Sequence, residues 1–223
     1  MSQFTPLAER LRPKSLDEYI GQEHLVGKDA VFRKTLEKGI IPSIIFWGPP
    51  GVGKTTLAKI LASSLDRPFY TLSAINSGVK DIREIIGKVE QQGLFGKGNA
   101  ILFIDEIHRF SKSQQDSLLG AVEQGILTLI GATTENPSFE VNSALLSRCQ
   151  VHVLKPLEKT HLKTLIERAL NEDAEIAKMG VELEDEKYLM QLSGGDARKL
   201  LNILESAVGA LPSGETKITE ELL

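Results

Sequence analysis

The chain has 223 residues, 41% of them hydrophobic and 25% charged, with a formal net charge of −4 at pH 7. This size and composition predict an ordinary globular protein of one large domain or a domain with a small appended one, and no apolar run approaches the roughly 20 residues of a membrane span. The net negative charge does not indicate a protein that binds nucleic acid through its overall charge. The single cysteine, Cys149, excludes an intrachain disulfide and fits a reducing compartment.

In chain order, the sequence predicts alternating helices and strands as far as Pro156. Short apolar runs predict strands at 43–47, 69–72, 100–104, 127–130 and 151–154, and helical spacing predicts helices at 29–38, 54–65, 81–92, 113–122 and 141–146. This alternation is typical of an α/β fold in which helices cover both faces of a parallel sheet. After Pro156 we expect no strands and only helices, at 159–171, 184–192 and 196–210. The expected domains are an α/β core over residues 1–156 and a small helical lid over 157–223.

The segment from Gly48 to Thr55 matches the pattern of a phosphate-binding P-loop, and it lies between a predicted strand and a predicted helix. Glycines let backbone N–H groups curl around phosphate oxygens, and the following helix presents its positive end to the anion. The pattern assigns Lys54 to the β and γ phosphates and the Thr55 hydroxyl to Mg²⁺. The candidate phosphate-binding residues are Gly48, Pro49, Pro50, Gly51, Val52, Gly53, Lys54, Thr55 and Thr56.

An acidic pair, Asp105 and Glu106, follows the clearest predicted strand. We expect these carboxylates at the carboxyl edge of the sheet, beside the P-loop. Asp105 could support Mg²⁺ through water, and Glu106 could orient or deprotonate an attacking water molecule. The string from Asp105 to His108 also resembles that of DExH helicases, which carry two such cores on a longer chain.

Three further polar groups have a functional and an ordinary interpretation. The small polar residues from Gly131 to Asn136 could sense the γ-phosphate or form a hydroxyl-rich turn. Arg148 could neutralise the transferring phosphoryl group or lie on the surface. Arg198, in the first turn after the predicted N-cap Asp196, could contact the nucleotide or be solvated.

Taken together, these motifs resemble the AAA+ ATPases of the clamp-loader branch, and most closely the replication-associated recombination protein A family. The resemblance covers nearly the whole chain, and its most specific strings are residues 7–13, 19–25, 77–83, 108–116 and 131–140.

The resemblance assigns roles to individual residues. It implies that Thr134 is the sensor-1 residue, with Thr133 and Asn136 as near alternatives. It implies that Arg148 is an arginine finger acting in a neighbouring subunit and that Arg198 is sensor 2 within its own subunit. It implies that Ser73 occupies the position of the residue that restrains the catalytic glutamate. In many relatives this restraining residue is asparagine. The residues implied to hold adenine are Arg12, Pro13, Tyr19, Ile20 and Gly21.

The resemblance also implies a biological setting. It implies a DNA-stimulated ATPase, with ATP and Mg²⁺, acting in DNA replication, recombination and repair at stalled or gapped forks. Its expected partners are DNA, single-strand DNA-binding protein and further copies of itself in a tetramer, and its expected location is the cytoplasm at the nucleoid. The oligomerisation domain of the family would follow Leu223, where a helix is expected to be just starting. The candidate DNA contacts, which could equally be solvated charges, are Lys80, Arg83, Arg109 and Lys112.

Two alternative functions remain open at this point. In a binding module, ATP would be a conformational ligand and recruitment of partners the output, although the full catalytic set argues against this. A branch-migration motor of a related AAA+ branch is the second alternative.

Overall fold

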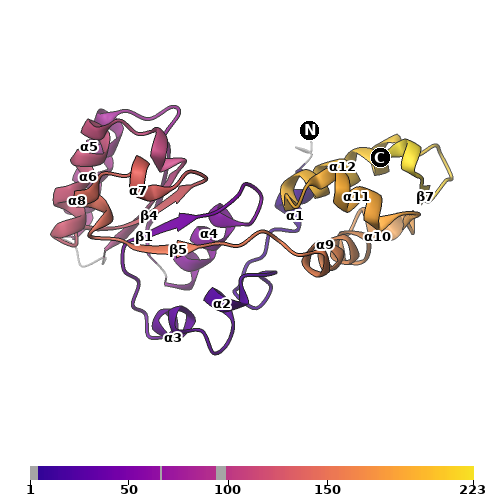
Figure 1. Ribbon diagram of the computed structural model, residues 1–223, viewed down its shortest axis with the longest axis horizontal. Helices are drawn as coiled ribbons and strands as arrows, with labels where there is room; N and C mark the ends of the chain where they lie inside the picture. Colours follow the sequence, from indigo (N-terminus) through magenta and orange to yellow (C-terminus); the bar gives the residue numbers. More distant parts are fainter. Residues whose placement is uncertain (1–4, 66, 94–98) are drawn as a thin grey trace. The chain divides into compact units, whose positions relative to one another are not determined.

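The computed structural model describes residues 5–65, 67–93 and 99–223. The chain forms two compact units (Figure 1), each with its own hydrophobic core. Residues 22–49 and 54–155 form the first, called here the sheet unit. Residues 5–21, 50–53 and 156–223 form the second, called here the helical unit. No helix in the described ranges is long and apolar enough to cross a bilayer.

The sheet unit contains a five-stranded parallel sheet, which confirms the predicted α/β fold. The strands are β1 (Ile44–Trp47), β2 (Phe69–Ser73), β3 (Ala100–Asp105), β4 (Leu127–Thr133) and β5 (Gln150–Val153). Their order across the sheet is β2-β3-β4-β1-β5. Strand β4 therefore lies between β1, which leads into the P-loop, and β3, which ends in the acidic pair. The P-loop and the acidic pair thus follow two strands that are separated by β4.

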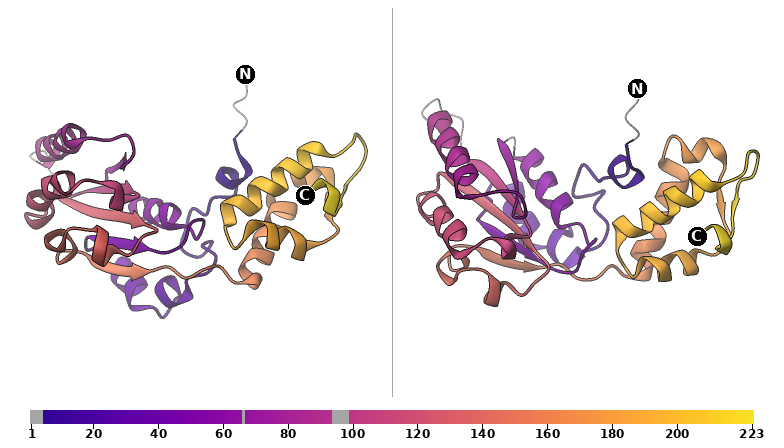
Figure 2. Two further views of the ribbon diagram at one scale, coloured as in Figure 1. Left: turned by 45° about the horizontal axis from the view of Figure 1, so that its top comes forward. Right: turned by 90° about the horizontal axis from the view of Figure 1, so that it is seen from above.

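Helices cover both faces of this sheet, with α4 on one face and α5 and α6 on the other (Figure 2). The helical segments of the unit are α2 (Glu23–Val26), α3 (Val31–Glu37), α4 (Lys54–Ser64), α5 (Val79–Gly93), η1 (Ile107–Arg109), α6 (Lys112–Glu123), α7 (Pro137–Glu140) and α8 (Ser143–Leu146). Ile82 of α5 and Leu118 of α6 pack with Ile104 of β3 in one buried cluster. All seven residues of β4 are buried, since successive side chains point to opposite faces and both faces are covered.

The helical unit is built from α1 (Leu7–Arg10), α9 (Lys159–Glu172), α10 (Ile176–Met179), α11 (Glu186–Ser193), α12 (Ala197–Ala210), η2 (Glu220–Leu222) and the strands β6 (Glu182–Leu183) and β7 (Lys217–Ile218). The expectation that strands stop after Pro156 was wrong, because β6 and β7 form a parallel pair. Each has only two residues, which is too short to produce an alternating pattern in the sequence.

The N-terminal segment, residues 5–21, belongs to the helical unit and not to the α/β core in which the sequence analysis placed it. Leu7 is fully buried in the helical core, and its backbone N–H donates to Glu205 Oε1 of α12 at 2.8 Å. A single apolar residue in a four-residue helix gives no sign of which core it joins, so this placement could not be derived from the sequence.

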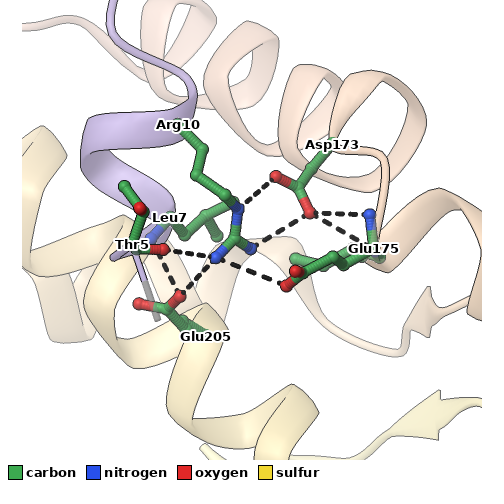
Figure 3. Close-up of polar contacts among 7 residues, drawn as sticks. Thr5, Leu7, Arg10, Asp173, Glu175 and Glu205 are labelled. Carbon is green, nitrogen blue, oxygen red and sulfur yellow. Dashed lines mark hydrogen bonds and ion pairs between the residues drawn. The ribbon is translucent and has the colours of Figure 1, made fainter. Parts of the chain in front are cut away.

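Arg10 fixes the same segment by an ion-pair network (Figure 3). Its Nε donates to Asp173 Oδ2 at 2.7 Å, and its Nη1 donates to Glu205 Oε1 at 3.1 Å. The Asp173 side chain is only 3% exposed, and its Oδ1 also accepts from the backbone N–H groups of Glu175 and Ile176. The hydrogen bond from Arg10 lowers the pKa of Asp173 below its usual range.

Arg10→Met is expected to lower the free energy of unfolding by about 2 kcal/mol, because it leaves the buried Asp173 carboxylate without its charged partner. Since the pKa of Asp173 is lowered in the folded state, this stabilisation is present above the unfolded pKa of about 3.9 and is lost as the pH falls through the folded value. Urea unfolding between neutral and acidic pH measures both effects. The matched control is Lys217→Met, which removes a 2.9 Å ion pair to Glu184 that is exposed on both sides. An equal loss in the two variants would contradict the importance of burial.

Candidate functional site

The loop between β1 and α4 depends on its glycines. Gly51 and Gly53 have φ angles of +71° and +96°, in the left-handed region that glycine adopts without strain. A Cβ atom on Gly53 would lie 2.5 Å from the hydroxyl oxygen of Tyr19, and one on Gly48 would clash with the carbonyl oxygen of Leu154. The backbone conformation therefore requires glycine at 51 and 53, and the available space requires it at 48 and 53.

Lys54 is the first residue of α4 and is only 7% exposed. Its Nζ donates to the carbonyl oxygens of Gly48 and Pro49 at 2.7 and 2.8 Å, so the loop itself holds the ammonium group. The Gly48 N–H donates to the carbonyl oxygen of Thr133 at 3.2 Å, which ties the start of the loop to the end of β4. A positive charge at the positive end of the 11-residue helix α4 is the arrangement that suits a phosphate group.

The acidic pair lies where β3 ends. Asp105 is the last residue of the strand, opposite Ser73 of β2 in the register, and is half-buried. Glu106 follows with φ 54° and ψ 47°, a left-handed conformation that costs a non-glycine residue about 1–2 kcal/mol. Such strain is concentrated at functional sites, and here it turns the chain sharply into η1.

The Glu106 carboxylate contacts two side chains. The Thr134 hydroxyl donates to Glu106 Oε2 at 3.4 Å, and His108 Nδ1 lies 3.3 Å from the same oxygen. Thr134 comes directly after β4, so the order β3-β4 in the sheet brings these two predicted residues together. Sequence reasoning did not identify His108 as a partner of Glu106; the only signal was a polar residue two positions after it.

Thr133 and Asn136, the two alternatives to Thr134 as the sensor-1 residue, make other contacts. Thr133 is completely buried, and its Oγ1 lies 3.0 Å from His108 Nδ1 and accepts from the Glu135 N–H at 3.0 Å. Asn136 is the N-cap of α7, where its Oδ1 accepts from the Ser138 N–H. Thr134 is thus the candidate whose hydroxyl reaches the acidic pair.

Ser73 makes no side-chain hydrogen bond to Glu106 among the described residues; its carbonyl oxygen accepts from the N–H groups of Asn76 and Ser77. The restraint that the resemblance implied for Ser73 therefore has no contact in the structure to support it. The contacts of the glutamate come instead from Thr134, directly after β4, and from His108 of η1.

The two candidate arginines lie in different units. Arg148, in the sheet unit, is exposed; it donates to the Ala144 carbonyl oxygen at 2.7 Å and forms an ion pair of 3.2 Å with Glu123. Arg198, in the helical unit, is exposed in the first turn of α12, after the N-cap Asp196. Sequence reasoning did not identify Glu123 as a partner of Arg148.

The five candidate adenine-binding residues all belong to the helical unit, as does the loop tip 50–53. The Tyr19 hydroxyl donates to the carbonyl oxygen of Val52 at 3.1 Å, and burial raises the pKa of Tyr19, so that it stays a protonated donor.

Arg12 Nε donates to Glu9 Oε2 at 2.9 Å. Gly21 has φ +76°, and a Cβ atom there would lie 3.0 Å from Leu157 Cδ2. Pro13 and Ile20 are half-buried in the same segment.

The donor set fits Mg²⁺ bound with a substrate and not a preformed metal centre. Within 5–65, 67–93 and 99–223, no three His, Cys, Asp or Glu side chains cluster as a metal site. Mg²⁺ usually keeps several waters and takes one or two protein ligands together with phosphate oxygens. Thr55 and Asp105, the predicted metal residues, are both half-buried in the sheet unit. Burial raises the pKa of the Cys149 thiol to about 12.

A phosphate-binding loop after a central parallel strand and an acidic pair after another define a P-loop nucleotide-binding protein. The model of the ATPase family associated with various cellular activities (AAA) matches residues 44–157, and the chain belongs to this family. Members of this family bind nucleotide with Mg²⁺.

The comparisons also confirm the resemblance to the replication-associated recombination protein A family. The chain is 50% identical over 206 residues to "Replication-associated recombination protein A" of Coxiella burnetii, covering 91% of this chain and 46% of that protein. The protein of the same name in Escherichia coli K12 is 44% identical over 226 residues, covering 99% and 50%. The chain thus spans about half the length of these relatives. Among solved structures, the Thermotoga maritima RuvB Holliday junction branch migration motor matches with a TM-score of 0.75 and 31% identity, covering 95% of this chain and 70% of that one.

Proposed function

We propose that this chain is an ATP-hydrolysing module, dependent on Mg²⁺ and stimulated by DNA, that acts in DNA replication, recombination and repair at stalled or gapped forks. The observation that carries the hydrolytic part is the meeting of Glu106 with Thr134 at the carboxyl edge of a sheet in which β1, the neighbour of β4, leads into the P-loop. The fork setting, the cytoplasmic location at the nucleoid and the partnership with single-strand DNA-binding protein rest on the similarity to the named relatives.

The roles of the individual residues follow from their chemistry. The backbone of 48–56 and the Lys54 ammonium group bind the phosphates. Thr55 and Asp105 would hold Mg²⁺, which would supply positive charge to the transferring phosphoryl group. Glu106 takes the proton of the attacking water and Thr134 senses the γ-phosphate. Arg198 acts as sensor 2 in its own subunit, and Arg148 completes the site of a neighbour in a homo-oligomer, a tetramer by family resemblance. Adenine lies against Arg12, Pro13, Tyr19, Ile20 and Gly21.

The test is the release of phosphate from ATP by the protein, measured with and without Mg²⁺ and across a panel of single-stranded, gapped and forked DNA. We expect turnover that requires Mg²⁺ and rises with gapped or forked DNA. Nucleotide binding without turnover on any DNA would favour the binding-module alternative.

A branch-migration motor is the second candidate, because the RuvB motor matches 95% of this chain at a TM-score of 0.75. The higher identity to the recombination proteins, 44–50% against 31%, favours the first proposal. A strand-displacement assay on branched DNA separates the two, since only a motor should move the branch point.

The DNA surface that we propose consists of Lys80, Arg83, Arg109 and Lys112, all exposed. They lie at the starts of α5 and α6 and in η1, and the Gln114 side-chain amide donates to the Ser77 carbonyl oxygen at 2.7 Å, which fixes these two helix starts beside each other. Within the described chain, none of the four cations forms an ion pair with an acidic side chain. Their charges are therefore available to phosphate groups.

The double variant Lys80→Ala/Arg83→Ala is expected to bind DNA more weakly and with a smaller salt dependence. Removing two phosphate contacts should reduce the slope of log K against log[salt] by roughly 1.8 on duplex and roughly 1.4 on single-stranded DNA. Fluorescence-anisotropy titrations at several salt concentrations measure this slope. The control is Lys28→Ala/Lys38→Ala, which removes two exposed lysines elsewhere on the sheet unit. Equal slopes for the two double variants would remove this surface from the proposal.

A further inference from the structure

The side chain of His108 lies between the candidate catalytic glutamate and the end of β4. Its Nδ1 is 3.3 Å from Glu106 Oε2 and 3.0 Å from Thr133 Oγ1. The imidazole is 13% exposed and Thr133 is completely buried, so one side of this contact is part of the protein core. The glutamate is thereby connected to a fixed point of the central sheet.

The local fold explains why the imidazole points back toward Glu106. The left-handed Glu106 starts η1, in which the Arg109 N–H donates to the Glu106 carbonyl oxygen at 2.9 Å. Ile107, the next residue, is completely buried, and it packs against Gly131 of β4, where a Cβ atom would lie 3.1 Å from its Cδ1. Glycine at 131 lets η1 approach β4 closely enough for His108 to reach Thr133.

The hydrogen-bond partners determine which nitrogen of His108 carries the proton. A carboxylate oxygen can only accept, so Nδ1 must donate in order to bind Glu106 Oε2. The Thr133 Oγ1 accepts from the Glu135 N–H at 3.0 Å and can donate its own proton to the Glu135 carbonyl oxygen at 3.1 Å. Thr133 therefore also has room for a donor from His108. The contact with Glu106 requires the proton on Nδ1, and the contact with Thr133 is compatible with it.

We propose that His108 is a positioning residue for Glu106, an inference that rests on the proposed ATPase function. The Thr134 hydroxyl donates to Oε2 of the carboxylate, and His108 Nδ1 lies 3.3 Å from the same oxygen. Oε1 makes no hydrogen bond to any described residue. Two donors on one oxygen fix the rotamer of the side chain and leave the other oxygen to accept the proton of the attacking water. His108 acts through Glu106 and does not itself contact the reacting atoms.

Three substitutions at this position test the inference. In His108→Asn the amide nitrogen replaces Nδ1, because both are bonded to Cγ, whereas His108→Gln places its amide one bond further out and His108→Ala removes the donor. We expect kcat to fall on the order of 10- to 100-fold in the Ala and Gln variants, since misplacing a catalytic group costs turnover. KM and the Kd for ATP should stay near the wild-type values. His108→Asn should retain most of kcat.

Two results would overturn the positioning role. One is a His108→Ala variant with wild-type kcat, and the other is a His108→Asn variant as slow as His108→Ala. A wild-type protein without Mg²⁺-dependent turnover would instead overturn the proposed function.

A spectroscopic measurement tests the contact without turnover. In ¹⁵N-histidine-labelled protein, the imidazole spectrum of His108 should show a protonated Nδ1 whose resonance moves in the Glu106→Gln variant. A proton only on Nε2 would overturn the inference whether or not ATP is hydrolysed. The assignment of the resonance comes from its loss in His108→Ala.

Discussion

Glu106→Gln is expected to bind ATP as the wild-type protein does and to lose turnover on the order of 10² to 10⁴-fold. The amide has the size of the carboxylate, and its oxygen can still accept from the Thr134 hydroxyl, which lies 3.4 Å from Glu106 Oε2. It cannot accept a proton from water near neutral pH. The substitution therefore removes the base and leaves the fold and the phosphate-binding loop intact.

Single-turnover release of phosphate is the right measurement for this variant, because it separates the chemical step from product release. Glu135→Gln is the matched control, since Glu135 is an exposed carboxylate on the loop that carries Thr134. We expect this control to hydrolyse ATP at the wild-type rate. If Glu106→Gln kept that rate as well, Glu106 would not be the base.

The sequence predicted the elements of the sheet unit well because their signals are local. Buried parallel strands are continuous apolar runs, and Ala100–Asp105 and Leu127–Thr133 are clear examples. The start of α6 is encoded in a capping box in which Ser111 and Gln114 bond each other's backbone N–H groups. The strand order is not local, so the sequence did not show that β4 separates the P-loop strand from β3.

In the candidate site, too, the sequence predicted the local features but not the contacts that depend on the packing of separate elements. The P-loop pattern specifies Lys54 and its glycines directly, because conformation and ligand chemistry act on adjacent residues. The contacts of Glu106 with Thr134 and His108 depend on the neighbouring positions of β3, β4 and η1, which no single motif encodes. The ion pair of Arg148 with Glu123 joins positions 25 residues apart in sequence and could not be found from either motif.

Arg148→Ala is expected to lose turnover on the order of 10³-fold while retaining ATP binding, because an arginine finger stabilises charge that develops only in the transition state. In the single chain the guanidinium is exposed and pairs with Glu123 at 3.2 Å. That pair lies on the surface and is weak, so a neighbour's phosphate groups can compete for Arg148. Glu123→Ala is the control, since it removes the local pair but leaves the finger and should keep turnover.

Mixing two inactive variants decides whether Arg148 acts in a neighbouring subunit. Glu106→Gln subunits keep Arg148, and Arg148→Ala subunits keep Glu106. In a mixed oligomer, some sites then combine an intact Glu106 with an intact Arg148 from the adjacent copy. We expect phosphate release to rise well above that of either variant alone and to depend on the mixing ratio. If Arg148 acted only within its own chain, no mixture would recover turnover, because every subunit would lack one of the two groups.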